Sequence, residues 1–549
     1  MAEHTPIPSH TGQSAAPQHV GPVLVTLLLG AFVTILNQTL LNVAIPRLMI
    51  DFNESASTVQ WLSTAYMMTN GVLIPVSAFL IATFTTRQLF ISAMVAFTAG
   101  SVICSIAPNF AVMLIGRIIQ AFGAGVIMPL LMTVVLNLFP PDRRGGAMGT
   151  IGIAMIFAPA VGPTLSGWII QNWSWRLLFW VVIPFAVLDI ILAAALLRNV
   201  TERSRPRFDW LGFITSTIAF GALLYGFSDA GNKGWGDSAV RASLIAGAVA
   251  LVLFIWREWT AEEPMLELRV FKYDMFSLTT IVSCVVNIAM FGAMILLPIY
   301  VQNIRGFTPL QSGLLLMPGA IVMGIMSPIT GKLFDRIGAR PLVIFGLLIT
   351  IVTTYDFAHL TGSTSYAHLM WLYTARMFGM SFIMMTIMTA GLNQLPRQMN
   401  AHGTAAANTA RTVAGSLGTA ILVTVMSTRT HVHYGMYADR MNITDPALSA
   451  TLQQFGSALA NQLGQTAQAG SALVSQMMYG LVMQQSTIDA TNDAFLVATA
   501  ITVLALVLSF FIRRVRPADQ PAGHPAARSA ARPQLPAGSP RKPEPAPAE

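Results

Sequence analysis

The amino-acid sequence predicts an all-α polytopic membrane protein in which two six-helix bundles flank two inserted helices, giving fourteen transmembrane helices. Of the 549 residues, 54% are hydrophobic and 10% are charged, a composition too apolar for a water-soluble domain of this size. The apolar residues fall into fourteen runs of about twenty residues, the length that crosses a bilayer. The first six runs and the last six are related by an internal repeat.

The spans follow one another along the chain with mostly short polar links. Because their number is even, both tails lie on one side, and the basic residues gather in the links of that side, which predicts cytoplasmic termini. The net charge of +8 therefore reflects membrane orientation and not nucleic-acid binding. The spans are predicted at residues 22–45, 57–81, 89–107, 110–136, 146–170, 177–197, 210–228, 239–257, 276–301, 310–331, 341–360, 366–392, 404–427 and 494–513.

An internal repeat relates the two halves. Sliding the chain on itself by 251 to 259 residues aligns Pro46 with Pro298, Gln60 with Gln311, Pro75 with Pro328, Arg87 with Arg340, Arg117 with Arg376, Pro140 with Pro396 and Gly162 with Gly418. Two parallel six-helix repeats favour a carrier whose halves rock about a central cavity. The seventh and eighth spans have no counterpart and form an insertion.

These boundaries define the predicted domains. They are a disordered N-terminal tail (1–21), an N-terminal bundle (22–200), an inserted helix pair with its links (201–272), a C-terminal bundle (273–515) that includes an extracytoplasmic loop (428–493), and a disordered tail (516–549).

The fifth span is interrupted by prolines and lined with glycines. A proline removes a backbone donor and disturbs the preceding turn, which a membrane bundle tolerates because neighbouring groups satisfy the freed carbonyls. Small residues allow another backbone to come close. We expect a hinge between the bundles at Gly152, Pro159, Gly162, Pro163 and Gly167.

Several motifs in order along the chain resemble those of a known family. They are LNQTLLNVAIP (Leu36 to Pro46), RIIQAFG (Arg117 to Gly123), the stretch around Gly162-Pro163, WSWRLLFW (Trp173 to Trp180) and GKLFDRIGARP (Gly331 to Pro341). Together they resemble the major facilitator superfamily, and within it the fourteen-span drug:proton antiporters of the lincomycin-resistance type. The resemblance covers roughly residues 22–515 and implies the major facilitator fold, a bacterial plasma-membrane location, and export driven by the proton motive force without a cofactor.

Arg117 places a fixed cation inside an apolar helix, which costs free energy unless it faces water or a partner. Gln120 lies on the same face. We expect either a cavity residue that tunes a proton site or binds an anionic ligand, or a structural residue that binds backbone carbonyls. Arg376 holds the equivalent position in the second half, and we include Gln120 and Arg376 in the predicted substrate cavity.

A proton-coupled carrier needs a titratable group, and a carboxyl group removed from water serves because its neutral form is then favoured. Asp189, in the middle of the sixth span, is the first candidate, and Asp356, in the outer third of the eleventh, is the second. The alternative for Asp189 is a structural pairing with Arg117 or a hydroxyl group. The alternative for Asp356 is simple contact with water at the membrane edge.

Two departures from the resembled family concern coupling and gating. The family usually has an aspartate where this chain has Asn37, whose amide cannot titrate, so Asn37 and Gln38 become candidate ligands for a polar substrate or hydrogen-bonding links between helices. The cytoplasmic gating motif is complete only in the second half, because Ala82 and Thr83 replace its charged residues in the first. The resemblance assigns the gate to Gly331, Asp335, Arg336, Gly338 and Arg340.

The loop 428–493 contains a predicted helix that starts at Asp445-Pro446 and carries an apolar stripe. The stripe is Leu448, Leu452, Phe455, Leu459 and Leu463. We expect it to cap the outer mouth of the protein's own bundle; the alternatives are docking of an extracytoplasmic partner and binding to the membrane surface.

The sequence contains no phosphate loop, metal-spaced cysteine and histidine cluster or nucleophile elbow, so we expect neither an enzyme nor an ATP-driven pump, and no metal site. The predicted function is a secondary multidrug exporter that exchanges amphipathic drugs for protons by alternating access, with the lipid bilayer as its other partner. The alternatives are an exporter or flippase of an endogenous lipid or metabolite, and a non-transporting membrane sensor or scaffold.

Overall fold

The structure, a computed structural model, describes residues 20–54, 56–141, 143–200, 207–440, 446–464 and 466–513. These residues form helices joined by short turns, with no strand among them, so the predicted all-helical fold is confirmed. The predicted tails lie almost wholly outside the described residues, although Val20 and Gly21 already belong to the first helix.

Six helices form the N-terminal bundle: α1 (Val20–Phe52), α2 (Ala56–Thr83), α3 (Thr86–Ile106), α4 (Phe110–Leu138), α5 (Arg144–Asn172) and α6 (Leu177–Leu196). The inserted pair is α7 (Trp210–Lys233) and α8 (Ser238–Thr260). The C-terminal part contains α9 (Asp274–Ile299), α10 (Pro309–Ile337), α11 (Ala339–Asp356), α12 (Tyr366–Ser381), α13 (Met384–Leu392), α14 (Asn400–Arg440), α15 (Pro446–Leu463) and α16 (Ala467–Ser509).

Short turns of tighter or wider helix complete the C-terminal part. They are η1 (Leu268–Lys272), η2 (Tyr300–Ile304), η3 (Phe357–His359) and η4 (Arg397–Met399), of which η2 is a π-helical turn that continues α9.

The described residues include thirteen helical segments long and apolar enough to cross a membrane. The span predicted at 276–301 corresponds to α9, whose apolar stretch Asp274–Met290 is shorter. The span predicted at 366–392 is interrupted, because α12 ends at Ser381 and α13 begins at Met384. Thr330 of α10 donates its hydroxyl to Ser381 O at 3.0 Å, which satisfies one carbonyl at this interruption.

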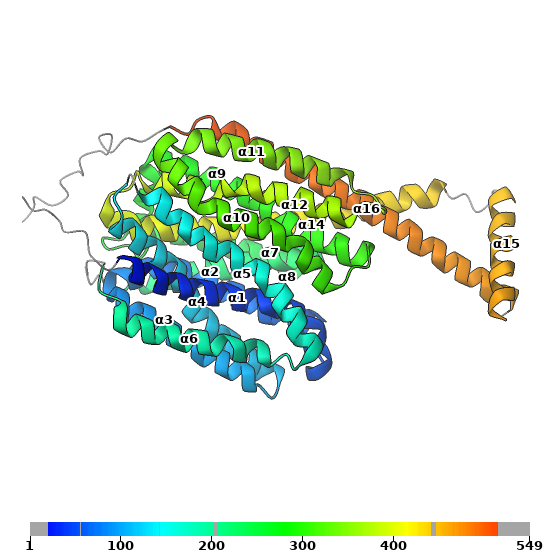
Figure 1. The fold of residues 1–549 in the computed structure, drawn as a ribbon, viewed down its shortest axis with the longest axis horizontal. Coiled ribbons are helices and arrows are strands. Elements are labelled where there is room, and N and C mark those ends of the chain that lie inside the picture. Colours follow the sequence, from blue (N-terminus) through cyan, green and yellow to red (C-terminus); the bar gives the residue numbers. More distant parts are fainter. Residues whose placement is uncertain are drawn as a thin grey trace, which may run out of the picture.

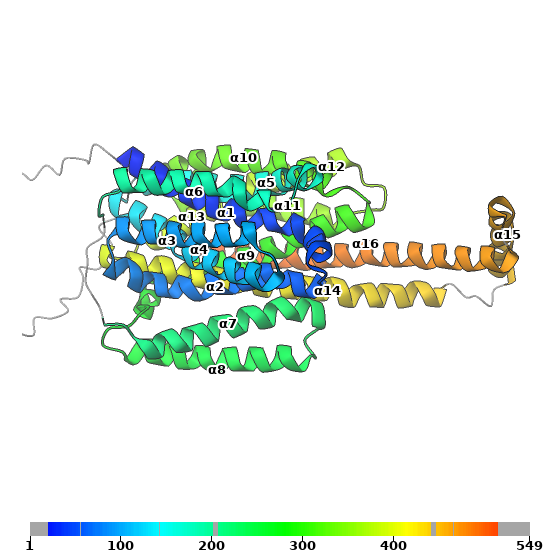
Figure 2. The same cartoon turned by 90° about the horizontal axis from the view of Figure 1, so that it is seen from below.

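The two bundles lie side by side with their long axes aligned (Figures 1 and 2). Helix α1 begins and α16 ends at the same end of the molecule, which we call the tail end; the opposite end is the arm end. The bundles meet along two seams, α5 against α10 and α2 against α14. Movement of one bundle against the other must therefore change both seams.

The inserted helices α7 and α8 pack closely through glycines. A Cβ on Gly247 would lie 2.8 Å from Leu223 Cγ, and one on Gly226 would lie 2.6 Å from Leu244 Cδ2. Helix α7 also packs against α2 and α14. The pair therefore covers the α2–α14 seam from outside, along the lower edge of Figure 2.

The region predicted as an extracytoplasmic loop is a helical arm formed by the outer parts of α14 and α16 together with α15. Helices α14 and α16 have 41 and 43 residues, and a span takes about 20, so roughly half of each extends past the bundle. Helix α15 lies across the far end of the arm and packs against α16 (Figures 1 and 2).

Helix α15 begins at Pro446, as predicted, whereas Asp445 lies outside the described residues. The expectation that its apolar stripe caps the bundle is wrong, because α14 and α16 carry α15 away from it. Phe455 and Leu463 of the stripe are exposed, whereas the side chain of Leu448 lies outside the described residues.

Gly338 joins α10 to α11 with φ +86° and ψ −179°, a conformation that is nearly exclusive to glycine. We expect Gly338→Ala to lower the free energy of unfolding by about 1–3 kcal/mol, seen as a lower melting temperature of the purified protein. Gly167→Ala is the matched control, because a Cβ there meets nothing within 4 Å and alanine favours a helix. Equal melting temperatures for the two variants would contradict this explanation.

Candidate functional site

Arg117 lies at the centre of a polar cluster inside the N-terminal bundle, with 1% of its surface exposed. Its Nη1 donates to Asn37 Oδ1 of α1 at 2.8 Å and to Gln120 Oε1 at 2.9 Å. Its Nε donates to Leu62 O of α2 at 3.4 Å, and the guanidinium lies 4.2 Å from the centroid of the Tyr66 ring. Amide oxygens, a carbonyl and an aromatic face therefore share the positive charge.

The cluster reaches a fourth helix through Gln120, whose Nε2 donates to Ser101 Oγ of α3 at 2.7 Å. The structure thus brings together Asn37, Arg117 and Gln120 of the predicted residues and links α1, α2, α3 and α4. Gln38 is half-buried and lies on another face of α1, because successive helical residues are turned by about 100°. These contacts join helices, as the structural alternative for Arg117 expects.

Asp189 is fully buried on α6, where it faces α1 and α3. A Cβ on Gly30 would lie 2.7 Å from Asp189 Oδ2 and 2.6 Å from Phe90 Cζ, so the missing side chain at Gly30 makes room for the carboxyl group. Neither carboxyl oxygen has a hydrogen-bond partner, so the alternative of a pairing with Arg117 or a hydroxyl is not present. An isolated carboxyl group in an apolar site is most stable in its neutral form.

Asp356 lies in the water-exposed environment that its alternative interpretation expected. It is the last residue of α11, its side chain is 48% exposed, and its Oδ2 lies 3.6 Å from His368 Nε2 of α12. The short turn η3 follows α11 directly and extends the helical segment to His359, so Asp356 lies near the end of this segment, at the arm end.

Glycines of α5 let it approach α10 at the first seam. A Cβ on Gly149 would lie 2.5 Å from Ser327 O, and one on Gly152 would overlap Ser327 Oγ. Ser327 Oγ in turn donates to Gly149 O at 2.8 Å. The two backbones are therefore close enough for a side chain to bond across the seam.

The other predicted hinge residues serve different contacts. Gly162 approaches Thr39 of α1, and Gly167 approaches no other group within 4 Å of an added Cβ. Pro159 and Pro163 lie inside α5, which runs from Arg144 to Asn172 without interruption. Hinge motion at these prolines stays a prediction.

The acidic residue of the predicted gate caps α5 from across the seam. Asp335 Oδ1 accepts from Gly145 N at 2.9 Å, and Oδ2 accepts from Gly146 N at 3.0 Å. These groups belong to the first turn of α5, where the helix dipole favours a negative charge. Gly331, one turn earlier in α10, lets its backbone reach Gly145 O.

Two further hydrogen bonds join the bundles at the tail end. Arg144 Nη1 donates to Asn393 Oδ1 at 3.2 Å, while its Nη2 donates to Leu136 O of α4 at 2.7 Å. Asn400 Nδ2 donates to Asn137 Oδ1 at 3.2 Å. Arg144 belongs to one of the basic links from which the orientation is predicted, and the sequence does not indicate its contact with Asn393, which is 249 residues away.

The predicted gate is asymmetric between the halves. Ala82 and Thr83 stand where the repeat would place a carboxylate and an arginine, so no equivalent carboxylate is available to cap the start of α14. Arg336 and Arg340, the remaining charged residues of the predicted gate, are exposed at the tail end.

Other buried ionisable groups lie apart from the Arg117 cluster. Arg376 on α12 is 3% exposed and its Nε has no partner. Arg411 on α14 and Glu258 on α8 are also buried and are missing from the predicted set. Arg411 was detectable as a lone charge within the run 404–427, and Glu258 directly follows the run 239–257.

Glu258 Oε2 accepts from Leu266 N at 3.0 Å, whereas its Oε1 has no partner. Its role in the structure is to hold the link after α8.

Comparison with known proteins identifies relatives that all belong to one family of transporters. The profile of the Major Facilitator Superfamily matches residues 27–419. The uncharacterized MFS-type transporter YhcA of Bacillus subtilis (strain 168) is 49% identical over 506 residues, which cover 92% of this chain and 95% of YhcA. The lincomycin resistance protein LmrB of the same organism is 38% identical over 508 residues, which cover 92% of this chain and 98% of LmrB.

A solved structure shows the same fold. The human organic anion transporter MFSD10 (TETRAN) matches with a TM-score of 0.61, covering 89% of this chain and 99% of that one. The sequence identity is 12%, so this likeness concerns the fold alone.

We expect Asp335→Asn to weaken the tail-end contact, because an amide brings no negative charge to the start of α5. Loss of a charged cap costs about 1 kcal/mol, which lowers the ratio of the closed tail end to the separated tail end about fivefold. The measurement is oxidative crosslinking of Gly146→Cys with Lys332→Cys, since a Cβ on Gly146 lies 3.6 Å from Lys332 Cγ.

The control is Arg340→Gln, an exposed change in the same motif, which should leave the crosslinking unchanged. Unaltered crosslinking in Asp335→Asn would show that the cap does not hold the bundles together.

Proposed function

The chain belongs to the major facilitator superfamily, and on this premise we propose that it is a secondary exporter of amphipathic drugs that works as a proton antiporter. It is a multi-pass membrane transporter and not an enzyme. The drug substrate class is supported by LmrB, a 38% identical relative named for lincomycin resistance.

The observation that carries the proposal is the closure of the tail end. In the described part of the chain, Asp335, Arg144 and Asn400 form hydrogen bonds between the bundles at this end, and Ser327 and Asn408 form others farther in. With the tail end facing the cytoplasm, as the basic links predict, this conformation is closed to the cytoplasm. Transport then requires these bonds to break as the seams rearrange, which is alternating access.

For proton coupling we propose Asp189, because it is the fully buried carboxyl group in the described spans whose two oxygens both lack a partner. A proton binds the carboxyl group in its apolar site, and its release requires a route to water that the other conformation opens. Asn37 then takes no part in proton transfer, since its Oδ1 accepts from Arg117.

Helix α1 provides the physical link between protonation and movement. Gly30 of α1 adjoins Asp189, Asn37 accepts from Arg117, and Thr39 meets Gly162 of α5. Gly30 and Thr39 are separated by about 14 Å along one continuous helix. A change in packing at Asp189 therefore shifts the same helix that contacts the predicted hinge.

We expect Asp189→Asn to reduce lincomycin-dependent proton movement at least tenfold in inside-out vesicles, because the amide has the same shape but cannot exchange a proton. Asp356→Asn is the matched control and should retain the movement within about twofold, since Asp356 is exposed at the arm end.

Lincomycin binding to each variant is measured in parallel, to distinguish a loss of proton coupling from a loss of the folded protein. Loss of proton movement with binding intact supports Asp189 as the carrier. Proton movement that survives Asp189→Asn would refute that assignment, and lincomycin binding without any proton movement in the unmodified protein would refute antiport.

A further inference from the structure

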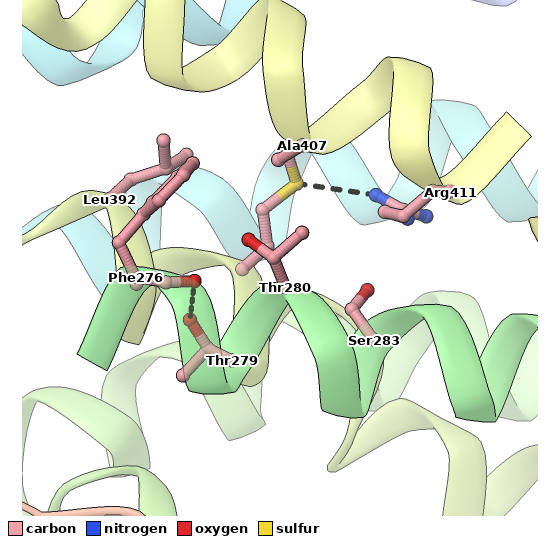
Figure 3. A pocket seen from close by; sticks show the side chains of 9 residues that line it. Phe276, Thr279, Thr280, Ser283, Leu392, Ala407 and Arg411 are labelled. Atoms are coloured by element: carbon pink, nitrogen blue, oxygen red, sulfur yellow. Dashed lines mark hydrogen bonds between the residues drawn. The ribbon is translucent and has the colours of Figure 1, made fainter. Parts of the chain in front are cut away.

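A small cavity with a mostly apolar wall and a few polar groups lies inside the C-terminal bundle, between α9, α13 and α14 (Figure 3). The space open to the centre of a water-sized sphere is about 10 Å³, room for about one water molecule. Its walls include Thr280 and Ser283 of α9, Met388 of α13 and Arg411 of α14. The cavity is separate from the Arg117 cluster, which belongs to the other bundle.

Arg411 enters this cavity as a buried cation without an adequate partner. It is 7% exposed, and its Nε has no hydrogen-bond partner. Its Nη1 donates to Met388 Sδ at 3.3 Å, the dashed contact of Figure 3, and a thioether is a weak acceptor. Arg117, by contrast, reaches two amide oxygens and a carbonyl.

The groups around the cavity favour a negative guest. The hydroxyls of Thr280 and Ser283 can donate hydrogen bonds, and no carboxylate is among the residues that line the cavity. A guanidinium left unpaired in an apolar bundle is costly, and an anion bound beside it removes that cost. A cation would meet only repulsion from Arg411.

The size of the cavity limits the guest to a small ion or a small end of a larger molecule. The Sδ of Met388 accepts the hydrogen bond of Arg411 Nη1. The methionine side chain is unbranched and can change rotamer, which enlarges the cavity. A bulky drug does not fit, but a chloride ion or a single carboxylate group does once the thioether moves.

We propose that Arg411, with the hydroxyls of Ser283 and Thr280, forms a binding site for one small monovalent anion in the C-terminal bundle. The guest is either inorganic chloride or the acidic group of a transported molecule, which share one negative charge and acceptor atoms only. This site does not depend on the proposed direction of transport or on proton coupling.

The test uses the purified full-length protein in detergent at constant ionic strength, with a bulky buffer sulfonate, sodium 2-(N-morpholino)ethanesulfonate, replaced stepwise by sodium chloride or sodium acetate. We expect the melting temperature to rise by a few degrees and to saturate, because an anion that binds the folded state stabilises it. Saturation by chloride alone identifies an inorganic guest, and saturation by acetate alone identifies an acidic group. Saturation by both shows that the site accepts either anion, and all three results support the proposal. A melting temperature that is the same in all three salts would overturn the proposal.

Variants assign the effect to the cavity. Arg411→Gln should abolish the saturable rise, whereas Lys272→Gln, which removes an exposed cation just before α9, should retain it. Ser283→Ala is the milder change and should raise the half-saturating anion concentration severalfold through loss of one donor. If Arg411→Gln does not fold, the Ser283→Ala midpoint decides, and an unchanged midpoint there counts against the site.

Discussion

The close approach of α5 and α10 is the constraint on which the arrangement of the two bundles depends. In a bilayer, apolar side chains gain little by leaving lipid for another helix, so helices associate where their backbones come near enough for van der Waals contact and hydrogen bonds. Gly145, Gly149 and Gly152 on one side meet Ser327 and Gly331 on the other. The glycines, which have no side chain, therefore determine where the two bundles touch.

This closeness also explains why one carboxylate can hold the tail end. Asp335 reaches two backbone N–H groups of α5 only because Gly145 and Gly331 allow the two backbones to meet. A larger residue at either glycine would move the carboxylate away from the helix start. The packing of the seam and the electrostatics of the cap are therefore parts of one contact.

Charges buried in the bundles follow a different rule from charges at their ends. The ion pairs of the described residues, such as Arg257 with Asp209 and Arg429 with Asp493, lie at helix ends or in the arm. Within the spans, Arg117 is balanced by neutral acceptors, and the two oxygens of Asp189 have none. Such groups are tolerated because the bundle packs around them, and each is a position where gain or loss of a guest ion or proton changes stability.

Much of this organisation was predictable, because a helix that crosses the lipid bilayer needs a long run of apolar residues. Long apolar runs predicted the spans, and the motif around Asp335 predicted a gate, although its partners at the start of α5 became visible only in the fold. Arg411 was not predicted as a site residue, because the repeat aligns it with Met155, which carries no charge. Comparison of the two halves therefore does not indicate a buried charge at this position. The arm was predicted as a loop because its many Ser and Gln residues make it too polar to read as a span, yet its Ala and Gln residues favour a helix.

The helical arm moves together with the C-terminal bundle, because α16 belongs to both. Helix α16 runs unbroken from the C-terminal bundle to α15, and its outer half is about 33 Å long. Each degree of rotation of that bundle therefore sweeps the tip through about half an ångström. In the proposed alternating access, a rocking motion that is small at the seams would become a displacement of several ångströms at α15, so the position of α15 would report which way the transporter is open.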